Sequence, residues 1–301
     1  MNIERILMPT DFSGTANAAL DHALFLAEHY GAELHLLHVH VLHDYDPRDT
    51  EKRFPGGEEI LGHLRGIATS ELGRLADEGA QRLTIHEAQC HGVSAADEII
   101  GYINDNEIDL VVIGSHGRRG LRHALLGSTA EEVVRHAPCP VFSLRQQAAG
   151  PLKAIKKMVA PIDFSEHSRH ALGVAKSLAA EYGASLTLAH VVERPIYPQF
   201  YDPISIYADD YSFPRLARHL EEALVDLFDE IDGPAVEHEI LVREGGAAST
   251  IVELADDVDA DLIVLATHGL TGVEHFLLGS VAEKVVRTAS CGVLTLKKPK
   301  E

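Results

Sequence analysis

The fold prediction for this chain starts from the stretch GSHGRRGLRHALLGSTAEE, which runs from Gly114 to Glu132. It follows residues 109–113, whose apolar and β-branched side chains are typical of a buried parallel strand. Glycines at 114, 117 and 127 bracket a loop, and a helical pattern begins at Ser128, with Glu131 at capping-box spacing. A strand, a glycine loop and a helix N-terminus in this order predict an anion-binding site, because backbone amides point outward there. A tight turn with an ordinary serine cap is the alternative interpretation.

The same stretch occurs a second time, as ATHGLTGVEHFLLGSVAEK from Ala266 to Lys284. Gly127 and Gly279 are 152 residues apart, and one offset relates matching residues from the first strand to the last. The other pairs are Asp11 and Asp163, Gly31 and Gly183, His38 and His190, His116 and His268, and Cys139 and Cys291. A constant offset predicts a whole domain duplicated in tandem rather than a solenoid, whose periods are roughly 20–50 residues. We expect domains at residues 1–146 and 153–301, joined by a linker at 147–152.

Composition limits the classes of partner that this chain can have. It has 301 residues and a formal net charge of −20, which argues against binding to nucleic acid or to an anionic membrane. No apolar run approaches membrane-spanning length, and the N-terminal residues read as a strand rather than as a signal peptide. Its three cysteines form no close pair in the sequence, which is typical of a reducing compartment. We therefore expect a cytoplasmic protein.

Strands and helices alternate along each repeat at the spacing of βαβ units. This alternation predicts an α/β fold, with two doubly wound domains whose parallel sheets are covered by helices on both faces. In the first repeat the expected strands are residues 5–9, 33–41, 83–90, 109–113 and 141–144. The first expected helix ends at residue 30. The second and third cover residues 58–80 and 94–106, and the fourth ends near residue 136.

Asp11 is the first candidate for ligand binding, because it lies just after the first strand. Ligands of doubly wound sheets bind beyond the carboxyl ends of the strands, at the point where the strand order reverses. If the first and fourth strands are neighbours, Asp11 faces the glycine loop, and the two hold the polar and anionic ends of a nucleotide. A helix N-cap is the alternative role for Asp11 and Asp163.

Histidines and cysteines elsewhere in the repeats give weaker signals. His116 and His268 lie inside the glycine loops, followed by His123 and His275, but the sequence supplies no nucleophile or orienting carboxylate beside them. Structural packing or a hydrogen bond to phosphate is the favoured role for these histidines, and we expect no catalytic residues.

A metal site is equally disfavoured by the sequence. His38, His40 and His43 lie close together, but the second repeat keeps only His190, so no metal ligands are expected among the protein's side chains. Cys139 and Cys291 lack a catalytic partner and are expected to be inert.

An aromatic segment follows the second strand of the second repeat. Six tyrosines and phenylalanines lie within residues 195–214. A loop folded onto its own domain is the favoured interpretation, and a lid or partner contact is the alternative.

Both repeats resemble the universal stress protein (UspA-like) family, and the chain resembles its tandem-domain members. The resemblance lies in the G-x2-G-x9-G-[ST] pattern that runs from Gly114 to Ser128, in Pro9-Thr10-Asp11-Phe12-Ser13 after the first strand, and in His38-Val39 at the end of the second. It implies a five-stranded parallel sheet of order 3-2-1-4-5, with ATP bound by many members and Mg²⁺ arriving on the nucleotide.

The resemblance also implies which residues bind the nucleotide: Asp11 and the backbone of Val39 hold the adenosine, and the glycine loop holds the phosphates. The implied set in the first repeat is Pro9, Thr10, Asp11, Val39, Gly114, His116, Gly117, Arg118, Gly127, Ser128 and Thr129. The corresponding weaker set in the second repeat is Pro161, Asp163, Val191, Ala266, Gly269, Gly279, Ser280 and Val281. Ala266 replaces the first glycine, and its methyl group is expected to hinder close approach of a phosphate.

The resemblance implies a stress-response regulator or sensor that binds ATP. Because the sequence shows no catalytic constellation, we expect little or no hydrolysis and not an enzyme. A slow ATPase on the same fold is one alternative, although the signature loops of related pyrophosphatases and synthetases are missing. A binding module for an apolar ligand or a protein partner, built on residues 195–214, is the other.

Two further expectations concern the whole chain. The repeats are expected to form an internal pseudo-dimer, with a homodimer of the chain as a further option, because their apolar fifth strands would otherwise leave exposed sheet edges. The first site is expected to bind more tightly, because Arg118, Arg119 and Arg122 have Leu270, Thr271 and Glu274 as their counterparts.

Overall fold

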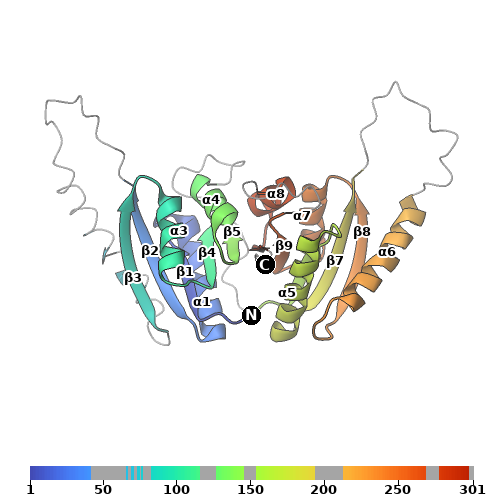
Figure 1. Cartoon of the computed structure of the whole chain (residues 1–301), viewed down its shortest axis with the longest axis horizontal. Coiled ribbons are helices and arrows are strands. Elements are labelled where there is room, and N and C mark those ends of the chain that lie inside the picture. The colour runs from blue at the N-terminus through green and yellow to red at the C-terminus, as the bar shows by residue number, and fades with distance from the viewer. Residues whose placement is uncertain are drawn as a thin grey trace, which may run out of the picture. The chain divides into compact units, whose positions relative to one another are not determined.

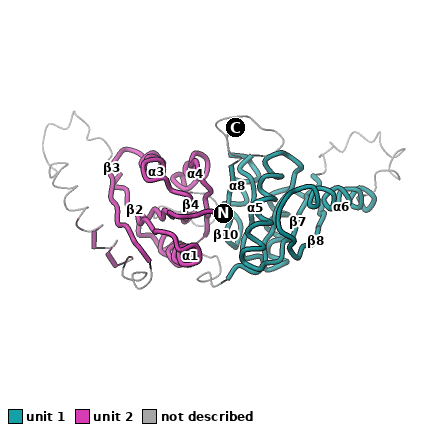
Figure 2. The backbone as a smooth tube through the Cα atoms, turned by 60° about the horizontal axis from the view of Figure 1, so that its bottom comes forward, with its two compact units in different colours: residues 1, 154–301 teal, residues 2–153 magenta. Residues whose placement is uncertain are grey.

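The computed structural model describes residues 1–41, 66, 69–70, 73–74, 76, 83–115, 127–145, 154–193, 213–268 and 278–297. The chain forms two compact units, which are coloured separately in Figure 2. The N-terminal unit comprises residues 2–153, and the C-terminal unit comprises residues 154–301 together with Met1. Within the described residues, no helix combines the length and the apolar character needed to cross a membrane.

Strands and helices alternate along both units (Figure 1). The N-terminal unit contains β1 (Arg5–Pro9), α1 (Gly14–Tyr30), β2 (Glu33–Val41), β3 (Ile85–Gly92), α3 (Ala95–Asp105), β4 (Leu110–Gly114), α4 (Ser128–His136) and β5 (Val141–Leu144). The C-terminal unit contains β6 (Lys157–Pro161), α5 (Glu166–Tyr182), β7 (Ser185–Val192), α6 (Phe213–Glu230), β8 (His238–Glu244), α7 (Ala247–Asp257), β9 (Leu262–Ala266), α8 (Ser280–Thr288) and β10 (Gly292–Leu296).

The strands of each unit pair in parallel and in the same order. In the N-terminal unit the order is β3-β2-β1-β4-β5, and in the C-terminal unit it is β8-β7-β6-β9-β10. Figure 2 shows α1 on one side of β2 and β4, with α3 and α4 on the other. The predicted α/β fold, doubly wound with strand order 3-2-1-4-5 in each repeat, is therefore confirmed.

The central strands form the core of each unit. Residues 6–8 of β1 and 111–112 of β4 are completely buried, as are Val159 and Ala160 of β6 and Ile263 and Val264 of β9. These strands are apolar at successive positions rather than at alternate ones, because helices cover both faces of a doubly wound sheet.

The duplication extends to individual hydrogen bonds. The carboxylate of Asp109 accepts bonds from the backbone N–H groups of Glu4 and Arg5 at 2.8 and 2.9 Å. Asp261 accepts bonds from Lys156 and Lys157 in the same way, at 2.7 and 3.0 Å. In each unit, this aspartate ties the start of the fourth strand to the start of the first.

The ends of the first helix of each unit also match. Ser13 caps the start of α1 and Ser165 caps the start of α5. Gly31 and Gly183 end these helices in the left-handed conformation, both with φ of 64°, which glycine adopts without steric cost.

Some predicted boundaries were wrong by one or two residues. The third strand covers Ile85–Gly92 rather than 83–90, and α3 spans Ala95–Asp105 with Ser94 as its N-cap. Short-range patterns fix the presence of an element better than its ends, where tertiary pairing decides. The predicted helix at 58–80 lies mostly outside the described residues, and the linker at 147–152 lies wholly outside them.

Candidate functional site

The turn after β1 is held by its own side chains. Asp11 Oδ1 accepts a hydrogen bond from the backbone N–H of Ser13 at 3.0 Å, and Thr10 Oγ1 accepts one from that of Phe12 at 3.0 Å. Ser13 caps α1, since its Oγ accepts a bond from the N–H of Ala16 at 3.2 Å. The N-cap alternative for Asp11 is therefore wrong: Asp11 forms an Asx turn two residues before the cap.

The C-terminal unit repeats this turn. Asp163 Oδ1 accepts bonds from the backbone N–H and the hydroxyl of Ser165 at 3.0 and 2.6 Å, and Ser165 caps α5. Ile162 stands where the N-terminal unit has Thr10, so it has no hydroxyl to accept a bond from the N–H of Phe164. The two turns share a backbone path but differ in their polar groups.

A phenylalanine in the left-handed region lies at the centre of each turn. Phe12 has φ of 61° and Phe164 has φ of 63°, a conformation that costs a non-glycine residue about 1–2 kcal/mol. The ring of Phe12 stacks on that of His38 at a centroid distance of 4.5 Å, and His38 Nδ1 lies 2.8 Å from the carbonyl oxygen of Thr10. Packing and hydrogen bonding thus hold the turn in a strained form, which is typical of functional sites.

The start of α4 differs from the prediction in a way that favours anion binding. Gly127 is the N-cap, with no capping hydrogen bond from a side chain, so the predicted capping box of Ser128 and Glu131 is wrong. The bond from Glu131 N–H to the carbonyl oxygen of Gly127, at 2.9 Å, is the first of the helical pattern. The amides of residues 128–130 precede it, at the positive end of the helix dipole.

The C-terminal unit has the same arrangement at α8. Gly279 is the N-cap without a side-chain bond, and Glu283 N–H donates to its carbonyl oxygen at 2.9 Å. A Cβ at Gly279 would lie 3.0 Å from the carbonyl oxygen of Thr267, which itself accepts the N–H of Gly279 at 2.8 Å. The close approach of these two backbone segments accounts for the glycine.

Gly114 serves packing within the unit. A Cβ at this position would lie 2.9 Å from Cγ2 and 3.0 Å from the carbonyl oxygen of Thr15, at the start of α1. In the sequence, the counterparts of Gly114 and Thr15 are Ala266 and His167. Close packing against α1 thus limits the side chain at residue 114. The sequence suggested a different reason for this glycine, the close approach of a phosphate.

Strand pairing brings the turn after β1 and the start of α4 to the same edge of the sheet, where the carboxyl ends of the strands lie. β1 pairs with β4 in parallel, so Asp11 and the Ser115–Gly127 junction follow neighbouring strand ends. Gly127 N–H donates to the carbonyl oxygen of Ser115 at 2.8 Å, which closes that junction. Val39 lies two residues beyond Leu37, the last residue of β2 in register with β1. The strand order reverses between β1 and β4, which is where such sheets bind ligands.

The predicted binding residues divide into described and undescribed ones. The N-terminal residues that lie at this edge are Pro9, Thr10, Asp11, Val39, Gly114, Gly127, Ser128 and Thr129. The matching C-terminal residues are Pro161, Asp163, Val191, Ala266, Gly279, Ser280 and Val281. Those that lie outside the described residues are His116, Gly117, Arg118 and Gly269, together with Arg119, Arg122, Leu270, Thr271 and Glu274.

Sequence reasoning missed the part of His38 and Thr10 in bracing the Asp11 turn. The sequence did carry a signal, because His38 recurs as His190 at the 152-residue offset. In the structure, His190 Nδ1 likewise lies 2.7 Å from the carbonyl oxygen of Ile162, with the same 28-residue separation as His38 and Thr10. His40 has a structural contact, since its Nε2 lies 2.9 Å from Gln89 Oε1. His43, His123, His275 and nearly all of the 195–214 segment lie outside the described residues.

The thiols of Cys90 and Cys291 are unsuited to nucleophilic chemistry. Burial, with a smaller contribution from Asp256, raises the pKa of Cys291 to about 12, and burial with Glu98 raises that of Cys90 to about 11. Both therefore stay protonated near neutral pH.

The comparisons with known proteins agree with this fold. The sequence model of the universal stress protein family matches residues 2–145 and again residues 154–297. Universal stress protein MJ0531 of Methanocaldococcus jannaschii is 35% identical over 150 residues, which are 48% of this chain and 84% of that protein. A putative universal stress protein of Staphylococcus aureus, SAUSA300_1656, is 31% identical over 145 residues, 47% of this chain and 84% of that one.

A solved structure matches the full length of the chain. The crystal structure of a universal stress protein from Archaeoglobus fulgidus aligns with a TM-score of 0.68 and 19% identity, covering 99% of both chains. At this identity the likeness supports the fold alone. The family model supplies the identity, because it matches nearly all of both units: the chain belongs to the universal stress protein family, in a tandem arrangement of two domains.

Proposed function

We propose that this protein binds adenine nucleotide between the carboxyl ends of β1 and β4, and acts as a cytoplasmic stress-response regulator or sensor. Asp11 and the backbone of Val39 contact the adenosine, and the amides of Ser128 and Thr129 contact the phosphates. Mg²⁺ arrives on the nucleotide. The three cysteines form no close pair in the sequence, which is typical of a reducing compartment.

The observation that carries the proposal is the start of α4. An N-terminus without a side-chain cap presents amide donors and a positive dipole end, which together suit a phosphate. It adjoins the strand end that carries Asp11, so one edge of the sheet offers both an anion site and a carboxylate acceptor. Since the chain as a whole carries a charge of −20, an anionic ligand depends on such local donors.

We propose that the bound nucleotide is retained rather than turned over. The described turn offers the carboxylate of Asp11, whose Oδ1 already accepts the N–H of Ser13. Donors that contact phosphates equally in the ground and transition states do not accelerate hydrolysis. ATP turnover by the purified full chain should be slower than about 1 per second, the low end of ordinary enzymes.

Calorimetry with MgATP on the full chain tests the proposal through Ser128→Asp. Ser128 is exposed at the first position of α4. A carboxylate there stabilises the helix by about 0.3–1 kcal/mol but repels a phosphate. Binding to the N-terminal site should weaken about tenfold or more, while the free energy of unfolding stays level or rises.

The matched control is Ala95→Asp, which adds the same charge at the start of α3 in the same unit. It should leave ATP affinity unchanged. Equal affinity of the wild-type chain and Ser128→Asp would argue against a phosphate at α4.

A further inference from the structure

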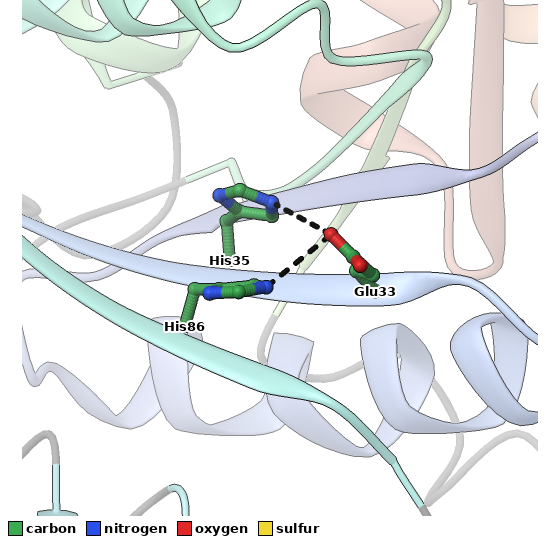
Figure 3. A group of neighbouring side chains, drawn as sticks. All are labelled: Glu33, His35 and His86. Carbon is green, nitrogen blue, oxygen red and sulfur yellow. Dashed lines mark ion pairs between the residues drawn. The ribbon is translucent and has the colours of Figure 1, made fainter.

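Three potential metal ligands meet at the amino-terminal ends of β2 and β3, on the edge of the sheet opposite Asp11. Glu33 and His35 are two residues apart in β2, so their side chains project from the same face. His86 of β3 lies directly opposite His35 in the parallel register. Figure 3 shows the three side chains converging across the two strands.

The distances suit a common ligand. Glu33 Oε2 lies 3.2 Å from His86 Nε2 and 4.0 Å from His35 Nε2. One ligand atom from each residue lies within 4.8 Å of the other two. Around Zn²⁺, with bonds of about 2.0–2.1 Å, tetrahedral ligand atoms are about 3.3–3.4 Å apart. The side chains of Glu33 and His86 are 48% and 46% exposed, so they have room to bring their ligand atoms to these shorter separations.

His35 supplies the second observation. Its side chain is 8% exposed, and its Nε2 is buried without a hydrogen-bond partner. An unpaired nitrogen of this kind is uncommon and costs free energy. The other nitrogen, Nδ1, lies 2.8 Å from the hydroxyl of Tyr102 in α3. When Nδ1–H donates to that oxygen, Nε2 carries the lone pair and points toward Glu33 and His86.

The contact between His35 and Tyr102 suits a metal ligand. A bonded partner on the remote nitrogen is the arrangement that orients metal-binding histidines in general.

We propose that Glu33, His35 and His86 bind a Zn²⁺ ion, with Tyr102 as a positioning residue for His35. Two imidazole nitrogens and one carboxylate oxygen are a common zinc ligand set, which leaves a fourth position for water. Mg²⁺ and Ca²⁺ prefer all-oxygen sites, so the two nitrogens select against them.

The C-terminal unit has the same fold without this ligand set. The counterparts of Glu33 and His35 are Ser185 and Thr187, and the register places Glu239 opposite Thr187, where β3 has His86. Thr187 Oγ1 donates to Glu239 Oε1 at 2.9 Å, so those two side chains satisfy each other. Leu254 replaces Tyr102 at the 152-residue offset. Among the described residues, one zinc site is therefore expected.

Zinc at this position would link β3, the outermost strand in the order β3-β2-β1-β4-β5, to its neighbour β2. A ligand that binds only the folded state stabilises it in proportion to the logarithm of its concentration over Kd. Zinc should therefore raise the Tm of the full chain.

Zinc calorimetry on the full chain, first stripped of metal with a chelator, tests the proposal. We expect one equivalent bound with micromolar or tighter affinity. His86→Ala and Glu33→Gln should each weaken it at least tenfold, and both alter half-exposed side chains, so the fold is retained. Tyr102→Phe should weaken it about tenfold to a hundredfold, the usual effect of removing a group that orients a ligand. Co²⁺ in place of Zn²⁺ should give a visible absorption band that both ligand variants lose.

The matched control is His219→Ala, which removes an exposed histidine of α6. It should leave the one-equivalent event unchanged, because the chain has 19 histidines and weak surface binding must be separated from the site. Absence of a one-equivalent event, or an event that His86→Ala and Glu33→Gln leave intact, would overturn the proposal. Neither result bears on ATP binding, whose residues lie at the other edge of the sheet.

Discussion

At the scale of single residues, a few polar side chains explain how each unit is held together. Asp109 accepts two backbone N–H groups where the first strand begins, and Asp261 does so in the other unit. No sequence pattern singles these aspartates out. A carboxylate that bonds backbone far along the chain is specified by tertiary geometry, which no local pattern encodes.

Asp109→Ala should lower the free energy of unfolding by about 1–3 kcal/mol, because it leaves two strand-end amides without their acceptor. Urea unfolding measures the loss. Asp105→Ala, which removes an exposed carboxylate from the end of α3, should change stability by no more than about 0.5 kcal/mol. Equal effects of the two substitutions would show that the hydrogen bonds of Asp109 contribute little.

Cys90 and Cys291 should react slowly with iodoacetamide near pH 7.5. A pKa raised by two units, as for Cys90, lowers the thiolate fraction about a hundredfold, and the greater nucleophilicity of a more basic thiolate recovers about tenfold. Alkylation of these two residues should be at least about tenfold slower in the folded chain than in urea, as followed by mass spectrometry of peptides. Comparable rates in both states would contradict the raised pKa values.

At the scale of elements, patterns of apolar residues predict the strands and helices well, whereas their ends depend on pairing. The glycine spacing from Gly114 to Gly127 correctly predicts a strand that ends at the first glycine and a helix that begins after the last. The loop predicted between them lies outside the described residues. The cap of α4 was predicted wrongly. Ser128 and Glu131 have the spacing of a capping box, but spacing alone does not show that their side chains bond the backbone. The bond from Gly127 N–H to Ser115 makes glycine the cap, and it joins residues brought together by the fold.

His22 in α1 predicts a pH dependence of stability. Its side chain is buried, Nδ1 lies 3.1 Å from the carbonyl oxygen of Ala18, and its ring lies against Phe142. Burial lowers the pKa of His22, opposed by the Ala18 bond and by Asp21. The unfolded chain therefore binds more protons as pH falls below about 6.5, so the free energy of unfolding falls with it.

The largest contribution of His22 to this slope is about 1.4 kcal/mol per pH unit. Urea unfolding from pH 7.5 to 5.5 should give a shallower slope for His22→Leu than for the wild-type chain. The absolute stability of the variant is not the test, because leucine also changes the packing. An unchanged slope would contradict the assignment to His22.

At the scale of the whole molecule, the duplication makes one unit the natural control for the other. The parallel sheet, the Asp11 and Asp163 turns and the glycine caps recur, while the surrounding polar groups differ. The fold and the recurrence of these turns were predictable, because one offset relates the two repeats. The cluster of Glu33, His35 and His86 was not, because His86 lies 51 residues from His35 and meets it only through strand register.

The sequence also predicts that the two halves depend on each other. The apolar fifth strands of the repeats would expose sheet edges in isolated halves. Residues 1–146 and 153–301 expressed separately should therefore be less stable or less soluble than the full chain, as measured by thermal unfolding and sedimentation. Two fully soluble halves that unfold independently, at the temperatures seen in the full chain, would refute an internal pseudo-dimer.

The central claim is that the N-terminal unit binds adenine nucleotide at α4, and more tightly than the C-terminal unit. Native mass spectrometry of the full chain titrated with MgATP tests it most directly, because it counts nucleotides per molecule. We predict that one nucleotide binds first, that Ser128→Asp removes this first event, and that Ser280→Asp affects only a weaker second event. No bound nucleotide at millimolar MgATP, or a first event lost in Ser280→Asp and kept in Ser128→Asp, would contradict the account.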